Sequence, residues 1–575
     1  MTALFARSRS ARALLALSIV ALPALAAPPA ILDRVPANAP MIMVTRDLQE
    51  MTGMAGQAME LAQSAGEVPG LDLYRYVDRL GNAPGVDGSG SMAVVMLTPP
   101  DLDDPGMAPD IVVLAPVTDY AALVAHFGGD AASPVTPLKM GRREMFARKI
   151  DDRTALLGGT RAAVEAFKVA EGAASGHLAR MGQAGRTAAD TADVLVVIDV
   201  ASYRPQMEQF AKGMMVDPDA GQMAMQLGGM GASFGRLAEA MSRDGKTGVL
   251  SVTNSEAGLA IEMVGVFTPE SPSATMFGSG GDSGALLDRL PDQPFYVAMA
   301  ADFSNPGIRA MFAGDGQKAE PDADPLANLG AMLADATGMG MVVGTNPNGP
   351  LAGLLVNTSA FIRTPEPAKS LAAFRGAAQA NKERAVGGTT VKTDYKTDVA
   401  QINGVSVDAW STQVIMPKDD PNAFMAGMVM QTLFGQSKGF SQMAAATDTG
   451  LVMTMSQNTP LVTKSIQAAK SGEGLGRQAA FAQIRDQLPK NRMFEMYVGM
   501  PGIMEFVQST LEEMLGEAVD LPKDVPLIGM GAGASNGEVS MRLFLPAKAM
   551  EAIGQAMQQW EGGDDFEPVD APAMN

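Results

Sequence analysis

The sequence predicts an α+β protein of two homologous lobes, built from repeated strand-helix-strand-strand-helix units, with mostly antiparallel sheets and helices on one face. Three observations support this fold class. Short apolar runs alternate with stretches that place apolar residues three and four positions apart, as strands and amphipathic helices do. Asn-Gly turns separate pairs of apolar runs, which indicates hairpins. One short motif recurs at an offset of 255 residues, which indicates an internal duplication.

The repeated motif opens both halves of the chain. It reads Leu-Asp-Arg-Val-Pro in the first half and Leu-Asp-Arg-Leu-Pro in the second. In each half an apolar run, an aspartate and a predicted helix follow it. The equivalent parts are residues 32–36 and 287–291, the runs 41–44 and 295–299, and Asp47 and Asp302.

Four hairpins follow four such openings. The second opening is the run 194–198, which ends on Asp199, and the fourth is the run 493–498. Asn536-Gly537 is the turn of the fourth hairpin, and both residue types tolerate positive φ. The predicted arms are residues 92–97 with 111–114, 249–252 with 259–264, 341–343 with 351–356, and 527–534 with 539–545.

Helices and one inserted piece complete each half. Apolar stripes predict helices after three hairpins, at residues 120–127, 371–374 and 550–560. The inserted piece of the first half has strands at 139–150 and 154–157 and a helix from Thr160; that of the second has strands at 390–415 and 451–455 and a helix from Thr459. Added helices at 324–336 and 421–433 account for the longer second half.

The first 26 residues predict a signal peptide. Arg7, Arg9 and Arg12 form a basic start, residues 13–22 form an apolar core, and Ala24 and Ala26 stand where a signal peptidase reads small residues. The apolar core is shorter than the roughly 20 residues that a membrane span needs. We therefore expect a protein exported to the periplasm or the medium, with no integral membrane segment after cleavage.

Composition shifts divide the mature chain. The Gly/Ser-rich stretch 278–284 predicts an interdomain linker. The first lobe is then residues 27–281 and the second residues 282–560. Residues 561–575 carry Asp564, Asp565, Glu567 and Asp570 without apolar periodicity, so we expect an acidic disordered tail.

Composition also excludes several function classes. The net charge of −20 disfavours nucleic acid and anionic lipid as partners. The absence of cysteine excludes disulfides, iron–sulfur clusters and thiol nucleophiles. His126 and His177 are the only histidines and lie far apart in the sequence, which disfavours a histidine-based metal site.

Three motifs resemble catalytic or nucleotide-binding signatures. Residues 231–235 (Gly-Ala-Ser-Phe-Gly) fit a nucleophile elbow, but no histidine follows them, so we interpret them as a helix-packing face. Residues 245–247 (Gly-Lys-Thr) resemble a phosphate loop, but a strand is predicted to follow. Residues 529–534 resemble a dinucleotide fingerprint, but we interpret them as a glycine-rich strand.

The remaining polar candidates lack a ligand-binding pattern. Asp101, Asp103, Asp104 and Asp110 cluster in a predicted loop, but their spacing fails the EF-hand pattern, so an acidic loop is favoured over a weak calcium site. His126 is expected at a helix C-terminus, and His177 is expected in an exposed small-residue linker. No catalytic, cofactor-binding or metal-binding residue is therefore assigned.

Two features leave alternatives open. The chain has 43 methionines, several at helical spacing (Met51, Met54 and Met59; Met425 and Met428; Met500 and Met504). These favour core packing, while copper binding, oxidant buffering and an adaptable binding surface remain alternatives. Asp47 and Asp302 are expected to cap the helices that follow them, and a shared binding cleft is the alternative.

The repeated pattern resembles a group of uncharacterised exported bacterial proteins that carry domains of unknown function. Their units open with Leu-Pro, an apolar strand and an acidic residue, and end with a hairpin and a helix. The resemblance covers most of residues 30–560 and implies no catalytic residue or cofactor.

The expected function is non-enzymatic binding or scaffolding in the cell envelope or the medium, with an envelope or extracellular partner. Methionine-based copper or oxidant buffering is one alternative. A carboxylate-dependent hydrolase is the other, because carboxylate pairs meet in space rather than in sequence. A large apolar groove would favour binding, converging methionine sulfurs would favour copper, and a cleft with two inward carboxylates would favour hydrolysis.

Overall fold

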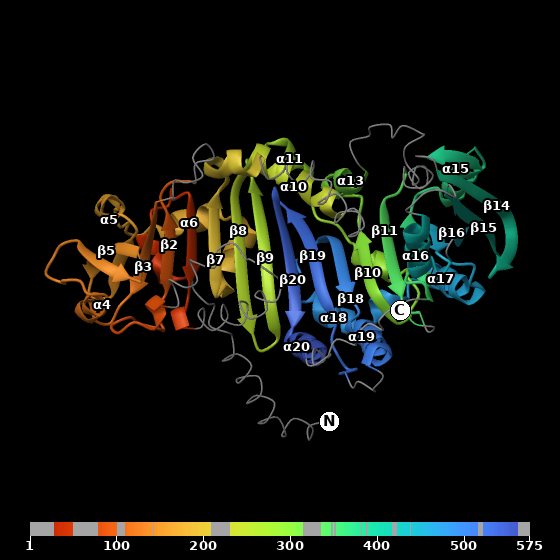
Figure 1. Cartoon of the computed structure of the whole chain (residues 1–575). Coiled ribbons are helices and arrows are strands. Elements are labelled where there is room, and N and C mark those ends of the chain that lie inside the picture. The colour runs from red at the N-terminus through yellow and green to blue at the C-terminus, as the bar shows by residue number, and fades with distance from the viewer. Residues whose placement is uncertain are drawn as a thin grey trace, which may run out of the picture. The chain divides into compact units, whose positions relative to one another are not determined.

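The computed structural model of the 575-residue chain describes residues 28–49, 79–99, 110–141, 143–208, 230–313, 335–346, 349, 352–380, 382–386, 389–416, 423–436, 439–515 and 521–561. These residues fall into two compact units (Figure 1). The first unit contains the residues up to Arg204 together with Lys246–Thr253. The second contains Pro205–Gly245 and the residues from Asn254 onward. The predicted signal peptide, residues 1–26, lies outside the described residues, as do residues 562–575 of the tail predicted at 561–575; Glu561 is the last residue of a helix.

The first unit is built on an antiparallel sheet in which β1 is a central strand. β1 pairs with β7 on one side and β2 on the other. The strand order is β8-β7-β1-β2-β3-β6-β5-β4. The strands are β1 (Met41–Thr45), β2 (Met92–Met96), β3 (Ile111–Pro116), β4 (Thr136–Met140), β5 (Arg143–Asp151), β6 (Thr154–Gly158), β7 (Val194–Asp199) and β8 (Gly245–Ser255).

Short helices complete the first unit. Asp119 begins α4 by accepting hydrogen bonds from the amides of Ala121 and Ala122. Leu123 and Val124 of α4 join a core with Met92 of β2. The helices are η1 (Ala30–Arg34), α4 (Tyr120–His126), α5 (Arg161–Ala166), α6 (Ala174–Arg180), α7 (Gly182–Thr191) and η2 (Val200–Tyr203).

The second unit is also built on an antiparallel sheet, and β10 lies between β18 and β11. The strand order is β9-β20-β19-β18-β10-β11-β12-β17-β16-β15-β14-β13. The strands are β9 (Gly258–Phe267), β10 (Phe295–Ala301), β11 (Gly338–Gly344), β12 (Thr358–Arg363), β13 (Glu383–Val386), β14 (Thr389–Ile402), β15 (Val405–Ile415), β16 (Gly439–Ala446), β17 (Leu451–Thr454), β18 (Arg492–Val498), β19 (Ile528–Ser535) and β20 (Glu538–Pro546).

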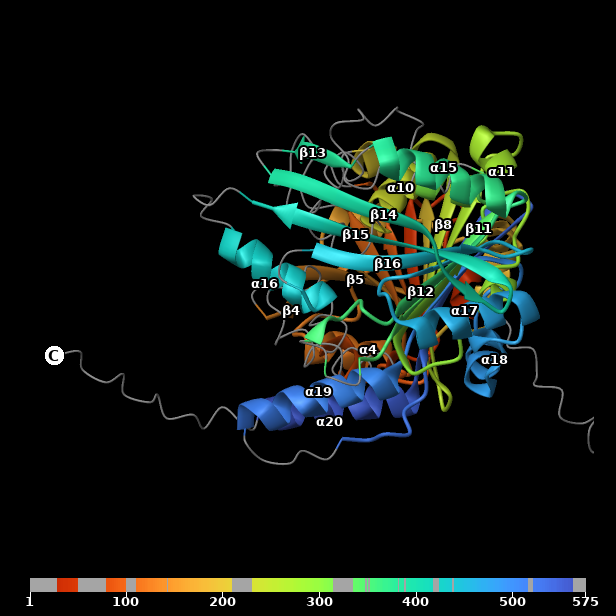
Figure 2. The same cartoon turned by 90° about the vertical axis from the view of Figure 1, so that its right-hand side faces the viewer.

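Helices of the second unit bury apolar faces against its sheet. Leu287 of α12, Ile466 of α17 and Ile484 of α18 share one core with Ala298 of β10. α19 and α20 lie side by side (Figure 2). The helices are α10 (Met230–Asp244), α11 (Pro272–Met276), α12 (Gly284–Leu287), α13 (Pro306–Ala313), α15 (Pro367–Ala380), α16 (Ala423–Phe434), α17 (Thr459–Ser471), η4 (Leu475–Arg477), α18 (Ala479–Arg485), α19 (Met500–Leu515) and α20 (Ala547–Glu561).

The structure confirms the prediction of a mixed protein with antiparallel sheets, and it confirms several local signals. Asn536 and Gly537 have φ of 53° and 74°, as the predicted two-residue turn between β19 and β20 requires. Thr160 caps α5 through its hydroxyl, and Gly472 ends α17 with φ of 67°. In the described part of the chain, no helix is long and apolar enough to cross a membrane.

The predicted third hairpin is wrong in its second arm. β11 pairs with β12, which begins at Thr358, rather than with residues 351–356. Leu354 and Leu355 instead donate their amides to the carbonyls of Thr432 and Leu433 at the end of α16. The amides of Leu354 and Leu355 thus satisfy the last carbonyls of α16. The segment is the partner of a helix end and not a strand, although its side chains are apolar.

The predicted linker at residues 278–284 is also wrong, because the segment lies within the second unit. Gly281 and Ser283 donate their amides to the carbonyls of Asn491 and Arg492. A Cβ atom on Gly280 would lie 2.3 Å from the carbonyl oxygen of Asn491. The glycines of the segment 278–284 therefore allow it to pack closely on the start of β18, and they do not mark a flexible linker.

In both units the repeated motif forms backbone hydrogen bonds with a segment that comes much later in the chain. In the first unit, Asp33 and Arg34 accept backbone hydrogen bonds from Ala173 and Ala170. In the second unit, Asp288 and Leu290 accept them from Gly474 and Leu475. The leading leucines, Leu32 and Leu287, are both fully buried. The motif therefore has a structural role in each unit.

The expectation of an exposed His177 is wrong. His177 lies in α6 and is fully buried. Its Nε2 donates to the carbonyl of Val35 at 2.8 Å, and its Nδ1 accepts from Arg180 at 3.2 Å. The small residues around His177, which by composition indicate a linker, instead allow close packing, as Gly176 does against Ala37. His126, in contrast, is the last residue of α4, as predicted, and it is exposed.

We expect His177 to make the first unit less stable in mild acid. Burial lowers the pKa of His177 below its ordinary 6.5, and the Arg180 charge adds to this effect. The folded state therefore favours the neutral ring. The stability that the neutral ring contributes is complete above pH 6.5 and is lost as the pH falls through the lower pKa of the folded state. Unfolding in urea at several pH values should show this loss in the natural chain and not in His177→Gln; an equal loss in both would exclude His177 as the cause.

Candidate functional site

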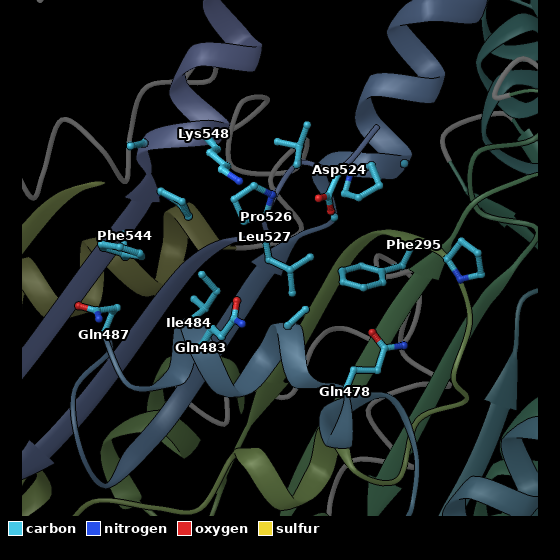
Figure 3. A pocket seen from close by; sticks show the side chains of 18 of the residues that line it. Phe295, Gln478, Gln483, Ile484, Gln487, Asp524, Pro526, Leu527, Phe544 and Lys548 are labelled. Carbon is cyan, nitrogen blue, oxygen red and sulfur yellow. The ribbon is translucent and has the colours of Figure 1, made fainter. Parts of the chain in front are cut away.

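A groove in the second unit is the main candidate site. Its volume is about 900 Å³. It is formed by α18, by the beginnings of α19 and α20, and by residues 524–527, which precede β19 (Figure 3). Volumes in this range are typical of sites that bind a small ligand or a short chain segment.

The floor of the groove is apolar. Phe295 and Phe544 come from β10 and β20, and Ile484 and Leu527 lie between them (Figure 3). All four belong to the main core of the unit, and each is at most 7% exposed. Phe295 stacks on Phe481 with ring centroids 5.6 Å apart. The floor is therefore a rigid outer layer of the core.

The rim of the groove is polar. Glu256, Asp292 and Asp524 supply three carboxylates, and Lys548 supplies an amine. Gln293, Gln478, Gln483 and Gln487 supply side-chain amides. Gln478 donates to Asp292 and Gln293 donates to the carbonyl of Asn357, so these two amides are fixed. Gln483 of α18 and Gln487, two residues after the end of that helix, also line the groove (Figure 3).

Two longer helices begin at the groove. Gly499 and Gly502 allow the start of α19 to lie against β10, since a Cβ atom on either would lie 2.1 or 2.6 Å from the carbonyl oxygen of Phe295. Ala547 and Lys548 form the first turn of α20 and also line the groove. Ala547 donates its amide to the carbonyl of Ala257, and Gly499 donates its amide to the carbonyl of Tyr296, so both helix starts are held against neighbouring segments.

A buried charge cluster holds α18 in place. Arg485 donates its Nε to Oε2 of the fully buried Glu495 at 3.3 Å, and Tyr497 donates its hydroxyl to the same atom at 2.6 Å. Arg485 also donates to the carbonyl of Gly476 at 2.9 Å. Burial and the Glu495 charge raise the pKa of Tyr497, so this hydroxyl keeps its proton. The helix that supplies Ala480, Gln483 and Ile484 to the groove is thereby fixed to β18.

A smaller hollow of about 480 Å³ lies next to the groove, along α19. It is lined by Met504, Glu505 and Glu512 of α19 and by Leu521 and Lys523. Met504 and Leu521 belong to the core between α19 and α20. This hollow shares Pro501 with the groove.

The structure separates the sequence motifs from this site. Residues 231–235 are part of α10, as the helix-packing interpretation predicts, and residues 245–247 begin β8. Residues 529–534 form the glycine-rich strand β19. Asp101, Asp103 and Asp104 lie outside the described residues. Among the described residues, no group of three or more acidic or histidine side chains is arranged to hold a metal ion.

The methionines at helical spacing that the structure describes lie in two different environments. Met500 and Met504 are buried in the core between α19 and α20, as the core-packing interpretation predicts. Met428 of α16 is instead 49% exposed, next to Phe424 at 75% and Val429 at 52%. Met51, Met54 and Met59 lie outside the described residues.

Asp302 does not cap α13, contrary to expectation. Asn305 caps that helix by accepting from the amides of Gly307 and Ile308. Asp302 is buried, pairs with Arg363 at 2.6 Å, and accepts from the amides of Asp282 and Ser304. Neither Asp302 nor Asp47 lines the groove. The helix expected after Asp47 lies largely outside the described residues.

Comparisons of the chain with protein-family models, with curated proteins and with solved structures return no match.

Proposed function

We propose that this protein is exported and acts by binding a ligand in the groove of its second unit, without catalysing a reaction. The observation that supports this most directly is the groove itself, in which an apolar floor meets a polar rim within one cavity of about 900 Å³. Sites for ligands commonly combine these features. The rigid floor costs little ordering on binding, which favours affinity.

The lining of the groove favours binding over catalysis. Its described lining residues include no serine, threonine, cysteine, histidine or tyrosine. Nucleophilic catalysis by a side chain held against a general base therefore has little support here. The carboxylates of Glu256, Asp292 and Asp524 keep a carboxylate-dependent hydrolase as a second candidate. All three are on exposed residues, whereas a carboxylic acid that acts as a general acid is commonly placed in an apolar environment.

Methionine-based copper or oxidant buffering gains less support. Met500 and Met504 pack with Leu521 and Val525 in an apolar core. A thioether in such a core fills space rather than meeting a metal ion from solvent. Met263 and Met428 are exposed and so accessible to oxidants, but they lie in separate elements, β9 and α16.

Export is supported by the first 26 residues alone. A basic start, a short apolar core and small residues at Ala24 and Ala26 are what a signal peptidase substrate needs. We propose release into the periplasm or the medium.

We also propose that the two halves arose by duplication and form homologous lobes of repeated units. The strand order β8-β7-β1-β2-β3-β6-β5-β4 in the first unit has the same pattern as β19-β18-β10-β11-β12-β17-β16-β15 in the second. β1 and β10, which follow the repeated motif, have equivalent neighbours in their sheets. Glu262 of β9 lies opposite Arg542 of β20. Glu262 is the seventh residue after Ser255, which ends β8, and Arg542 is the seventh after Ser535, which ends β19, so the two residues hold equivalent positions in their halves.

Filling the groove should abolish ligand binding. Ala480 is exposed on α18 and lines the groove, so Ala480→Trp places an indole at the groove without changing charge or breaking the core. We expect the affinity for the neutral apolar dye N-phenyl-1-naphthylamine, followed by its fluorescence, to fall by at least about tenfold.

Ala482→Trp is the matched control. Ala482 is exposed on the same helix but does not line the groove, so the dye should bind as to the natural chain. Equal binding by both variants and the natural chain would show that the dye does not occupy the groove and would remove the support for this function.

A further inference from the structure

We propose that the ligand of the groove is a short extended peptide segment that carries apolar side chains beside a lysine or arginine. This inference rests on the proposed binding function and names the chemical class of its ligand. Three properties of the groove carry it: the apolar floor, the charges of the rim and the neutral hydrogen-bonding groups between them.

The floor selects for apolar side chains. Phe295 and Phe544 present the aromatic part, and Ile484 and Leu527 present the aliphatic part between them (Figure 3). The volume of about 900 Å³ holds more than one side chain. A peptide that places alternate side chains on this floor would bury them against a surface that is already ordered.

The rim selects for positive charge. Glu256, Asp292 and Asp524 face one cation, Lys548, so formal charges among the lining residues sum to a negative value. The whole chain carries −20, which attracts cations over long range and repels anions. An anionic amphiphile would meet three carboxylates at the rim, whereas a lysine or arginine side chain would pair with one of them.

The neutral groups distinguish a peptide from a simple cationic amphiphile. Gln483 and Gln487 offer amides that both donate and accept. An alkyl amine would satisfy the floor and the carboxylates but would leave these donors without a partner from the ligand. A peptide supplies carbonyl and amide groups between its side chains and so matches all three parts of the groove.

The test uses the full mature chain and three fluorescein-labelled peptides of equal length, followed by fluorescence polarisation. The first peptide alternates lysine with leucine and phenylalanine, the second replaces lysine with glutamate, and the third replaces leucine and phenylalanine with serine. We expect the first to bind, and the second and third to bind at least about tenfold more weakly. Ala480→Trp should abolish binding of the first peptide, and Ala482→Trp should leave it unchanged.

Charge at the rim is tested separately. Asp524→Asn removes a rim carboxylate and should weaken binding of the lysine peptide by about threefold, the usual size of an exposed charge pair. Asp486→Asn is the matched control, because Asp486 is exposed directly after α18 but does not line the groove. The control should bind the peptide as tightly as the natural chain.

The outcomes separate the two proposals. If Ala480→Trp blocks the neutral dye but the lysine peptide binds no better than the other two, the binding function stands and the peptide class is wrong. If the lysine peptide binds equally to Asp524→Asn, Asp486→Asn and Ala480→Trp, it binds elsewhere and the inference is overturned. If neither dye nor peptide depends on residue 480, both proposals fail.

Discussion

Replacing Arg485 with alanine is expected to lower the free energy of unfolding of the second unit by about 3 kcal/mol, because it removes one of the two cations beside a buried carboxylate. Glu495 is fully buried, and Arg485 is the residue that both pairs with it and donates a hydrogen bond to it. Arg492 lies 3.2 Å away as a charge contact, which keeps the expected loss at the lower end of the range for broken buried pairs.

Urea unfolding followed by the fluorescence of Trp410, which is buried in the second unit, measures this loss. Lys369→Ala is the control, because Lys369 pairs with Glu366 at 2.7 Å while both side chains are at least 60% exposed. Such a pair contributes about 1 kcal/mol or less. A loss for Arg485→Ala no larger than the loss for Lys369→Ala would mean that Glu495 does not depend on Arg485.

The same substitution should also disturb the groove. Arg485 fixes α18 to β18 and to the carbonyl of Gly476, and α18 supplies Gln483 and Ile484 to the site. We therefore regard Arg485 as a positioning residue that does not itself line the groove.

Local signals in the sequence predicted local structure well. Asn536-Gly537, Thr160 and Gly472 each have a preferred backbone geometry or cap of their own, and each acts over a few residues. The strands expected after the repeated motif are also present, because a short apolar run between turns is itself a local signal for a buried strand.

Signals that depend on distant partners were missed. The small residues around His177 indicate a linker by composition, yet they pack on η1 because of residues about 140 positions earlier. The position of Asp302 before a helix suggested a cap, but Arg363 and two backbone amides take its carboxylate. In both cases the partner that fixes the side chain comes from a distant part of the chain, so the local sequence pattern gives no sign of it.

The groove could not be predicted from the sequence. Its floor joins Phe295, Ile484, Leu527 and Phe544, which come from four separate segments. Each is an ordinary core residue in its own segment, and Gln483 of α18 resembles any polar residue on the solvated face of a helix. The nearest signal was the pair of glycines, Gly499 and Gly502, at the end of an apolar run, where a helix start comes close to another strand.

Asp408→Asn is expected to lower the free energy of unfolding by about 3 kcal/mol at neutral pH. Asp408 is fully buried and accepts two hydrogen bonds from Arg375, at 2.6 and 2.8 Å, and one each from the Tyr395 hydroxyl and the Asp398 amide. An asparagine keeps one acceptor oxygen but loses the charge that Arg375 pairs with. The ring of Tyr395 stacks on Trp410, so the fluorescence of Trp410 reports this region directly.

The pH dependence of Asp408→Asn tests the cause. Burial by itself raises the pKa of Asp408, but the hydrogen bonds from Arg375, Tyr395 and the Asp398 amide outweigh it and hold the pKa below the ordinary 3.8. The folded state thus favours the charged carboxylate, so its contribution is complete above 3.8 and is lost as the pH falls through the lower folded pKa. The difference in stability between the natural chain and Asp408→Asn should be constant from neutral pH to about pH 5 and should shrink below about pH 3. Asp394→Asn is the control, because Asp394 is 67% exposed in its pair with Lys396 and should change stability little at any pH. A difference that stays the same in strong acid would show that the shape of the asparagine, and not the lost charge, destabilises the variant.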